Sequence, residues 1–487
     1  MADETPIRRP PRQRLLTLSS NEGERHASWL ELFFDLVFVL AVAKVAAILA
    51  RESDLYGFLK FVALFVPVWW AWVGYTFYAD RFESDKIEFR VMMFAAMLAV
   101  AVWALTLGGA FTLAGDPAFV GSYVAVLGIL ILLYIATAIH VPLARPLAAR
   151  FIFAFGTTVA LMLVSLLFEP PVRYWLWLAA LLIALVSPFL NLRQTRTIPF
   201  DLTHIPERFG LFTIIVLGEA VVATANGVAG APWNFTTGIV AVLGFAMAAC
   251  IWWINFEFVE DDAIKSPKIG PRFVYLYGHF FTVASIVAIG IGVEHSIKEA
   301  AQNHLRPSTL VLLGGGVAVY LAAITIVKLA SGVCRLLFVR LTAIAASVGI
   351  AALGAFLPPF TVVIGLLAVL VIGAWLESRF AEQRETSGST GIARCEHAAA
   401  AVVFEPRSTQ GCEQCVKNNY KWVHLRVCLT CGHVGCCDSS VYKHASKHFH
   451  AENHPLMASL EELESWAWCY VDERFVPLEQ GVGNVVA

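Results

Sequence analysis

Long apolar stretches recur along most of the chain and predict membrane-spanning helices. Each is about 18–23 residues long, close to the roughly 20 residues that a helix needs to cross the hydrocarbon core of a bilayer. Twelve such stretches precede residue 378, at 29–50, 57–78, 91–113, 119–139, 150–168, 174–192, 209–226, 235–256, 272–293, 309–330, 336–357 and 360–377. The pattern predicts an all-α polytopic membrane bundle of about 12 transmembrane helices.

The loops between these stretches differ in their basic residues. One alternate set of connections carries fourteen Lys and Arg residues, and the opposite set carries four. Residues 1–28 are also basic and predict a cytosolic N-terminal arm. By the positive-inside rule, both termini are expected in the cytoplasm, with the chain as a multi-pass protein of the inner (plasma) membrane.

The pattern changes after the last apolar stretch. Residues 29–377 form the predicted transmembrane domain, and residues 378–394 lose their hydrophobicity, which predicts a flexible linker. Residues 395–476 predict a small C-terminal α+β domain, followed by a tail at 477–487. Two units of different character are therefore expected.

Composition agrees with a membrane protein. Of the 487 residues, 58% are hydrophobic and 15% are charged, whereas soluble domains average about 25% charged residues. The expected partner of the apolar part is the lipid bilayer. The net charge of −2 gives no indication of a nucleic acid partner.

The first apolar stretch carries charges that a simple span would lack. Glu31 and Asp35 are four residues apart and lie on one helix face. Lys44 lies nine residues beyond Asp35, half a turn round, so it cannot be the partner of Asp35 within this helix. Each charge therefore needs a partner from another helix or from water.

Two further polar residues are predicted at depth in the membrane. Glu219 lies ten residues into the seventh stretch, and His279 is comparably deep in the ninth. Together with Asp35 and Glu31 they are candidates for a proton or cation relay, or for a polar substrate cavity. The alternative is that these groups are hydrogen-bonded and only fix helix packing.

Cysteine and histidine dominate the C-terminal domain. Eight of the ten cysteines lie between Cys395 and Cys469, in a part predicted to face the reducing cytosol. Pairs separated by two residues, such as Cys412 and Cys415, together with His444 and His448 on one helical turn, are typical of zinc ligands. A module this small gains folding energy from metal. With every ligand position filled, the zinc is expected to be structural, and no enzymatic activity is expected.

Two motifs in the membrane part carry a family resemblance. The sequences ASWLELFFDLVFVLAVA (27–43) and HIPERFGLFTIIVLGEAV (204–221) resemble the bacterial low-temperature-requirement protein A family. The resemblance covers about residues 25–380. It implies an inner-membrane protein with many spans and with a molecular activity that is not established.

The C-terminal part is similar to the ubiquitin-protease-type (UBP) zinc finger, which in eukaryotes grips the free C-terminal tail of ubiquitin. The order of ligands with WVHLRVCLTCGHVGC, HASKHFHAENHP and WAWCY carries the similarity. It implies three zinc ions, held respectively by Cys412, Cys415, Cys436 and His444; by Cys428, Cys431, His448 and His454; and by Cys395, His397, Cys469 and Asp472. Family members with three zincs have Cys at the position of Asp472.

The same resemblance nominates a peptide-binding surface. Trp422, Trp468 and Tyr470 match aromatic residues that contact the ubiquitin tail, and the alternative is that they belong to the core. The Arg that meets the tail carboxylate has no counterpart, because the chain reads Cys-Cys-Asp at 436–438. An acid there should repel a carboxylate, which argues against ubiquitin binding.

Two functional hypotheses follow. In the first, the bundle is a transporter, and its cytosolic finger recognises a protein or a peptide C-terminus. In the second, the chain is a non-transporting recognition or sensing platform that the bundle anchors in the membrane.

Overall fold

The computed structural model describes residues 27–84, 86–190, 204–258, 269–331, 336–391, 395, 397, 406–438, 440–461, 466–472 and 474–477. The chain forms two compact units, which divide between Glu377 and Ser378. The basic arm predicted at 1–28 lies outside the described residues except for Ala27 and Ser28, and the tail lies outside them except for Pro477.

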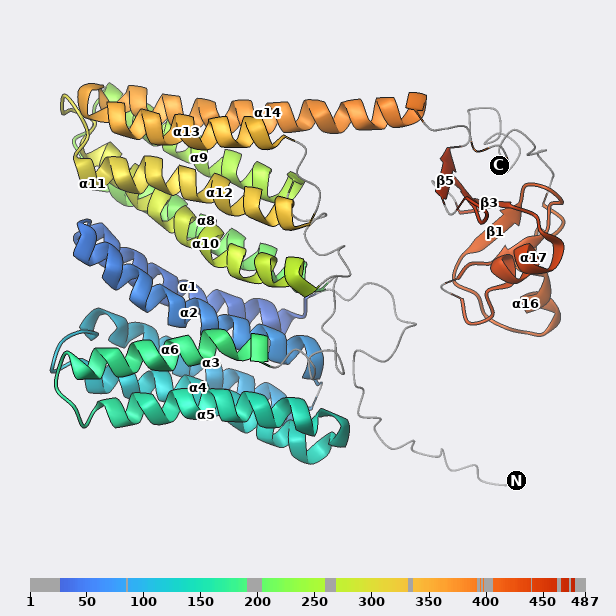
Figure 1. Cartoon of the computed structure of the whole chain (residues 1–487), viewed down its shortest axis with the longest axis horizontal. Coiled ribbons are helices and arrows are strands. Elements are labelled where there is room, and N and C mark those ends of the chain that lie inside the picture. Colours follow the sequence, from blue (N-terminus) through green and yellow to red (C-terminus); the bar gives the residue numbers. More distant parts are fainter. Residues whose placement is uncertain are drawn as a thin grey trace, which may run out of the picture. The chain divides into compact units, whose positions relative to one another are not determined.

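The first unit confirms the predicted helical bundle (Figure 1). Among the described residues, twelve spans are long and apolar enough to cross a membrane. They are formed by α1 (Trp29–Arg51), α2 (Leu55–Phe82), α3 (Ile87–Thr106), α4 (Asp116–His140), α5 (Arg145–Ser165), α6 (Val172–Leu190), α8 (His204–Ala229), α9 (Phe235–Phe258), α10 (Ile269–Lys298), α11 (Pro307–Leu310) with α12 (Gly316–Ala330), α13 (Leu337–Leu353) and α14 (Pro359–Gly391).

Local sequence fixes where the first helix begins. The hydroxyl of Ser28 accepts a hydrogen bond from the backbone N–H of Glu31, and the Glu31 carboxylate accepts one from the backbone N–H of Ser28 at 2.9 Å. This reciprocal capping box satisfies two backbone donors that a helix start leaves open. Glu31 is therefore held at a defined position at the helix end.

Helices α1, α2, α8 and α10 form the centre of the bundle. α1 packs against α2 and α3 on one side and against α8 and α10 on the other. In Figure 1, α3 to α6 lie beyond the α1–α2 pair, and α9, α12, α13 and α14 lie beyond α8 and α10. Residues on α1 and α8 therefore meet although they are far apart in the sequence.

Small residues allow the closest helix contacts. Gly292 of α10 lies against the π-helical turn Val311–Gly315 (η4) that joins α11 to α12. A Cβ added at Gly292 would lie 2.8 Å from the backbone nitrogen of Leu313, closer than real contacts allow. Since glycine lets two backbones approach, it is the residue expected at such a crossing.

The last helix is longer than the sequence predicts. Residues 378–391, expected to belong to a flexible linker over 378–394, continue α14 as helix as far as Gly391. The stretch Ala-Glu-Gln-Arg-Glu at 381–385 consists of good helix formers, and extending an existing helix needs no new nucleus. Loss of hydrophobicity therefore marked the end of the membrane span and not the end of the helix.

The described residues of the second unit form a small antiparallel sheet with two short helices. Its five strands have the order β2-β1-β3-β4-β5, with β1 (Leu425–Cys428), β2 (Val434–Cys436), β3 (Leu456–Ser459), β4 (Trp466–Cys469) and β5 (Arg474–Pro477). The helices are α16 (Glu413–Lys417) and α17 (His444–Glu452). Its apolar core is small, built around Val427, Val434, Leu456 and Ala467. A core of this size needs further cross-links, and the cysteines and histidines supply candidates for them.

Candidate functional site

Arg208 is the centre of a buried charged network in the bundle. Its side chain, on α8, is 1% exposed and ranks among the largest fully buried side chains of the described residues. Nη1 lies 2.7 Å from Oε1 of Glu31, and Nη2 lies 2.6 Å from Oδ1 of Asp35. Because Glu31 and Asp35 are one helical turn apart, the two arms of one guanidinium reach both carboxylates. The missing partner of the α1 acids is therefore Arg208.

A histidine extends the network to a third helix. His204 lies four residues before Arg208, on the same face of α8, and has no exposed surface. Its Nε2 lies 3.4 Å from Oε2 of Glu31, and its Nδ1 lies 2.9 Å from Oδ1 of Asp80 on α2. Asp80 is also fully buried. One imidazole thus bridges acids from α1 and α2.

Aromatic side chains from α2 and α8 pack beside Asp35. Trp72 of α2 donates its indole N–H to Oδ1 of Asp35 at 2.8 Å. The Trp72 ring stacks on Phe212, with ring centroids 4.3 Å apart, and contacts the edge of Phe209. Asp35 therefore accepts bonds from both an arginine and an indole, and apolar rings separate it from the deeper part of the bundle.

His279 belongs to a neighbouring, uncharged site. Trp69 donates its indole N–H to Nδ1 of His279 at 3.2 Å, so this nitrogen carries a lone pair and no proton. The proton then sits on Nε2, which lies 3.2 Å from both the carbonyl oxygen of Phe209 and the hydroxyl of Thr213. A neutral imidazole satisfies every one of these contacts. The geometry thus favours a positioning role for His279 over a proton relay.

A small cavity with a mainly apolar lining and a few polar groups adjoins His279 between α8, α9, α10 and α12. The cavity has a volume of about 30 Å³, which is enough for one or two water molecules. Its polar lining comes from Thr213, Asn255, Tyr275, His279 and Thr282, and Phe209 separates it from Trp72. The amide of Asn255, which is 8% exposed, supplies both donor and acceptor groups to this space.

Glu219 lies away from the charged network. It follows Arg208 by eleven residues on α8, which is about 16 Å along a helix. Its carboxylate is half-buried and lies within electrostatic range of Glu294 on α10. The structure thus brings together Glu31 and Asp35, places His279 beside them, and leaves Glu219 at a different depth. Lys44 is exposed, as its position opposite Asp35 predicts.

Two further clusters of ion pairs, one buried and one half-buried, tie the bundle together. Asp116 on α4 lies 2.9 Å from Arg173 on α6 and accepts a bond from Tyr174 at 3.3 Å. Glu377 on α14 pairs with Lys328 on α12 at 3.1 Å and with Arg340 on α13. The second cluster fixes α14 where it leaves the first unit. Neither cluster contains histidine.

Sequence reasoning missed His204, Arg208, Asp80 and Trp72 as members of the network. Arg208 was assigned to a loop, because its stretch of apolar residues begins at 209. A signal was present: His204 and Arg208 are four residues apart, the same spacing as Glu31 and Asp35. Two matched pairs at helical spacing indicate faces that complement each other.

The C-terminal unit brings together three groups of metal-ligating side chains. They are Cys412, Cys415, Cys436 and His444; Cys428, Cys431, His448 and His454; and Cys395, His397, Cys469 and Asp472. In each group the ligand atoms lie within 4.8 Å of one another. These are the three sets that the resemblance to the UBP finger implies.

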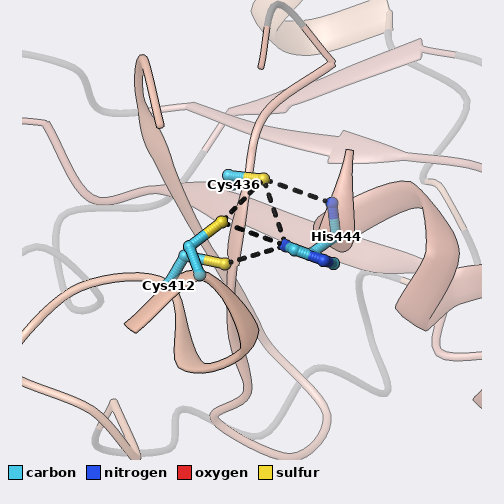
Figure 2. Close-up of side chains that lie close together, drawn as sticks. Cys412, Cys436 and His444 are labelled. Carbon is cyan, nitrogen blue, oxygen red and sulfur yellow. Dashed lines mark hydrogen bonds between the residues drawn. The ribbon is translucent and has the colours of Figure 1, made fainter. Parts of the chain in front are cut away.

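The first group has the dimensions of a zinc site (Figure 2). Nδ1 of His444 lies 3.2 Å from the sulfur of Cys412, 3.3 Å from that of Cys415 and 3.4 Å from that of Cys436. A tetrahedron of zinc ligands with bonds of about 2.0–2.3 Å has edges of about 3.3–3.8 Å. Four buried or half-buried soft ligands at this spacing fit zinc and leave no position open for a substrate.

The second group is supported by a residue that the sequence did not single out. Nε2 of His448 lies 3.3 Å from the sulfur of Cys431 and 3.2 Å from Nδ1 of His454. His433, which the ligand pattern leaves unused, stacks on the His448 ring at 4.3 Å and lies 3.1 Å from Glu413. Burial, with His433 and His454 nearby, lowers the pKa of His448 to about 4. The imidazole is therefore neutral at neutral pH, as a zinc ligand must be.

The third group includes a carboxylate. Nδ1 of His397 lies 3.9 Å from the sulfur of Cys395, 3.7 Å from that of Cys469 and 3.4 Å from Oδ2 of Asp472. Carboxylate oxygen is an accepted zinc ligand. Asp472 thus occupies the position of a fourth ligand.

The candidate peptide-binding residues are half-buried. Trp422 covers the first ligand group, where it packs against Cys412 and Cys415 and approaches Gly411 closely. Tyr470 stacks on Phe449 at 4.8 Å. Trp468 lies on β4, opposite Met457.

The exposed acid Asp438 lies close to this surface. Ser446 donates to Asp438, and its hydroxyl is 3.0 Å from that of Tyr470. A negative charge therefore stands beside Tyr470.

Comparisons with known proteins agree with both units. The model of the family described as "Bacterial low temperature requirement A protein (LtrA)" matches residues 26–375, and that of "Zn-finger in ubiquitin-hydrolases and other protein" matches residues 412–480. The uncharacterized protein RA0937 of Rhizobium meliloti (strain 1021) is 26% identical over 330 residues, which cover 61% of this chain and 75% of that protein.

A solved structure is also similar. The solution NMR structure of protein RPA1320 from Rhodopseudomonas palustris is 51% identical over 17% of this chain and 81% of that chain, with a TM-score of 0.17. With the twelve spans and the cysteine–histidine groups already described, the family matches identify both parts of the molecule. The chain belongs to the bacterial low temperature requirement A protein (LtrA) family and carries a zinc finger of the UBP type after its membrane domain.

Proposed function

We propose that the bundle transports a small solute or ion, and that the network of Arg208, Glu31 and Asp35 is its working centre. The observation that carries this proposal is the burial of three acids with their basic partners where α1, α2 and α8 meet. Burying charge within membrane-spanning helices is costly, and ionisable groups in such helices mark substrate and ion pathways. The cavity beside His279 lies next to this network and has room for water or a small ion.

The test begins with the purified full-length protein. Amino acids, sugars, organic acids and inorganic ions are screened for thermal stabilisation, and the flux of each stabilising solute is then measured in proteoliposomes. The double variant Glu31→Gln/Asp35→Asn should lower the flux by about tenfold or more. Asp116→Asn is the matched control, because it weakens a buried ion pair outside the network. The proposed transport function would be contradicted if every stabilising solute entered the proteoliposomes no faster than it enters empty liposomes.

We propose that the finger recognises a cytosolic protein or peptide, with zinc in a structural role and no enzymatic activity in the chain. Filled ligand groups support the structural role, and the half-buried aromatics Trp422, Trp468 and Tyr470 supply a surface. Helix α14 runs from the last span to Gly391, four residues before Cys395, so a partner of the finger is linked to the bundle by a short connection.

We further propose that the protein lies in the inner membrane with both termini in the cytoplasm. The excess of Lys and Arg in one set of loops supports this orientation. In intact cells, a membrane-impermeant thiol reagent should leave the cysteines of the finger unlabelled, and disruption of the membrane should expose them. Labelling of these cysteines in intact cells would show that the finger lies outside the cytoplasm and would contradict the proposed orientation.

A second function is supported by the Glu377 cluster. Lys328 and Arg340 hold α14 within the bundle, which suits a membrane anchor for the finger that moves no solute. A specific partner captured by the full-length protein, together with the absence of flux, would favour this alternative.

A further inference from the structure

His204 faces a carboxylate at each of its two ring nitrogens. Nδ1 lies 2.9 Å from Oδ1 of Asp80, and Nε2 lies 3.4 Å from Oε2 of Glu31. A neutral imidazole donates from one nitrogen and presents a lone pair at the other. If both acids were ionised, that lone pair would point at a carboxylate oxygen in a site without solvent. The three groups are therefore compatible only when they hold one additional proton.

The neighbouring elements contribute the other ionisable groups at this end of the bundle. They are Glu31 and Asp35 on α1, Asp80 and Arg81 on α2, the half-buried Glu83 just after α2, Glu207 and Arg208 on α8, the exposed Glu257 on α9, and Arg272 and the neutral His279 on α10. Glu207 accepts a bond from the backbone of Ala27, and Glu83 accepts one from Ser28. These two acids stand where α1 begins, one turn or less from the buried group, and offer a route for protons from solution.

We propose that Glu31, His204 and Asp80 form a proton-binding site, and that release of this proton is coupled to solute movement through Arg208. The second part of this proposal, the coupling to solute movement, rests on the transport function proposed above. Glu31 and Asp35 share one guanidinium, so loss of the proton changes the charge that Glu31 presents to Arg208.

The change can reach the cavity over a short distance. Phe209, the residue after Arg208, lines the cavity and contacts Trp72, which bonds Asp35. The proton thus stays on the His204 side, and the solute pathway is placed on the His279 side, where the cavity has room for water or a small ion and must widen for a larger solute.

The proton site is tested without any transport measurement. The full-length protein is labelled with ¹⁵N-histidine, and the His204 signal is assigned by its loss in His204→Gln. At neutral pH we expect one of two signatures. Either the His204 ring is protonated on both nitrogens, or the protein shows a carboxylic-acid infrared band that Glu31→Gln or Asp80→Asn removes. Asp116→Asn should leave either signature unchanged. A singly protonated ring without such a band would overturn the site.

Coupling is tested in proteoliposomes that contain a trapped pH-sensitive dye. Addition of a solute that the screen identifies should move protons across the membrane with the wild-type protein, and His204→Gln should reduce this proton movement by about tenfold or more. Glu31→Gln provides a second variant should His204→Gln fail to fold. Solute flux without proton movement would overturn the coupling. Absence of all solute flux would overturn the proposed function, and the histidine signal would still decide the proton site.

Discussion

Arg208 and Asp35 are 173 residues apart in the sequence, yet Nη2 of the arginine lies 2.6 Å from Oδ1 of the aspartate. This contact joins the first helix of the bundle to the helix that follows the long polar connection after α6. Since both side chains are fully buried, each depends on the other for charge compensation. The functional proposals all start from this pair and its neighbours Glu31 and His204.

Removing the Arg208 charge should strongly destabilise the bundle. Arg208→Met leaves Glu31 and Asp35 buried without their cation, which typically costs about 3–5 kcal/mol. Arg208→Lys should recover only part of this loss, because an ammonium cannot reach both carboxylates as a guanidinium fork does. The measurement is thermal unfolding of the purified protein in detergent. Lys44→Met is the control, since Lys44 is exposed, and an equal loss of stability there would contradict the prediction.

The spans and the metal ligands were predictable because both signals are local in the sequence. A run of apolar residues identifies its own helix, and a Cys-x-x-Cys pair such as Cys412 and Cys415 identifies its own ligand turn. The acid Asp35 within α1 also indicated that this helix needs a partner. These features depend on neighbouring residues along the chain, which a single sequence records.

Arg208 could not be predicted as the partner of Asp35, because a single sequence does not show which helices pack against each other. Nothing local in the seventh span says that it packs against α1, and Arg208 resembled one more loop charge. Glu219 was nominated for depth alone, and the structure places it about three turns from Arg208 along α8. Helix α14 continues through 378–391, part of the stretch predicted as a linker, because hydrophobicity reports membrane burial, while helix continuation depends on propensity.

A methyl group at Gly292 should disturb the contact between α10 and the η4 turn. A Cβ there would lie 2.8 Å from the nitrogen of Leu313, and backbone cannot move aside cheaply. We expect Gly292→Ala to lower the unfolding free energy by about 1–3 kcal/mol. Gly349→Ala is the matched control: a Cβ at Gly349 meets no atom within 4 Å, so this variant should be neutral or slightly more stable. Similar effects from the two variants would contradict the packing.

Zinc content should follow the three ligand groups. Elemental analysis of the purified full-length protein should give about three zincs per chain, the number of groups in the C-terminal unit. Asp472→Ala should remove one zinc, whereas Asp472→Cys should keep it by supplying thiolate. Asp438→Asn, an exposed acid outside all three groups, should change nothing. A content of two zincs that Asp472→Ala leaves unchanged would show that the carboxylate does not ligate.

Asp438 should set which peptides the finger accepts. Its charge stands close to the Tyr470 hydroxyl through Ser446, so a terminal carboxylate arriving there meets repulsion. We expect a peptide with a free C-terminal Gly-Gly carboxylate to bind poorly, and Asp438→Arg to tighten its binding by about tenfold, as one charge-assisted contact allows. The amidated peptide should show no such gain in calorimetry. Tight binding of the free peptide by the wild-type finger would contradict this expectation.

The most direct test of the account is a double-mutant cycle between Asp35 and Arg208, measured as equilibrium unfolding in mixed micelles. Asp35→Asn and Arg208→Gln should each destabilise the bundle, while the double variant should lose less than the sum by about 1–3 kcal/mol. Such coupling would establish that the acid of the first helix and the arginine of α8 form one buried unit. Additivity to within about 0.5 kcal/mol would contradict the pairing and with it the proposed centre of the bundle.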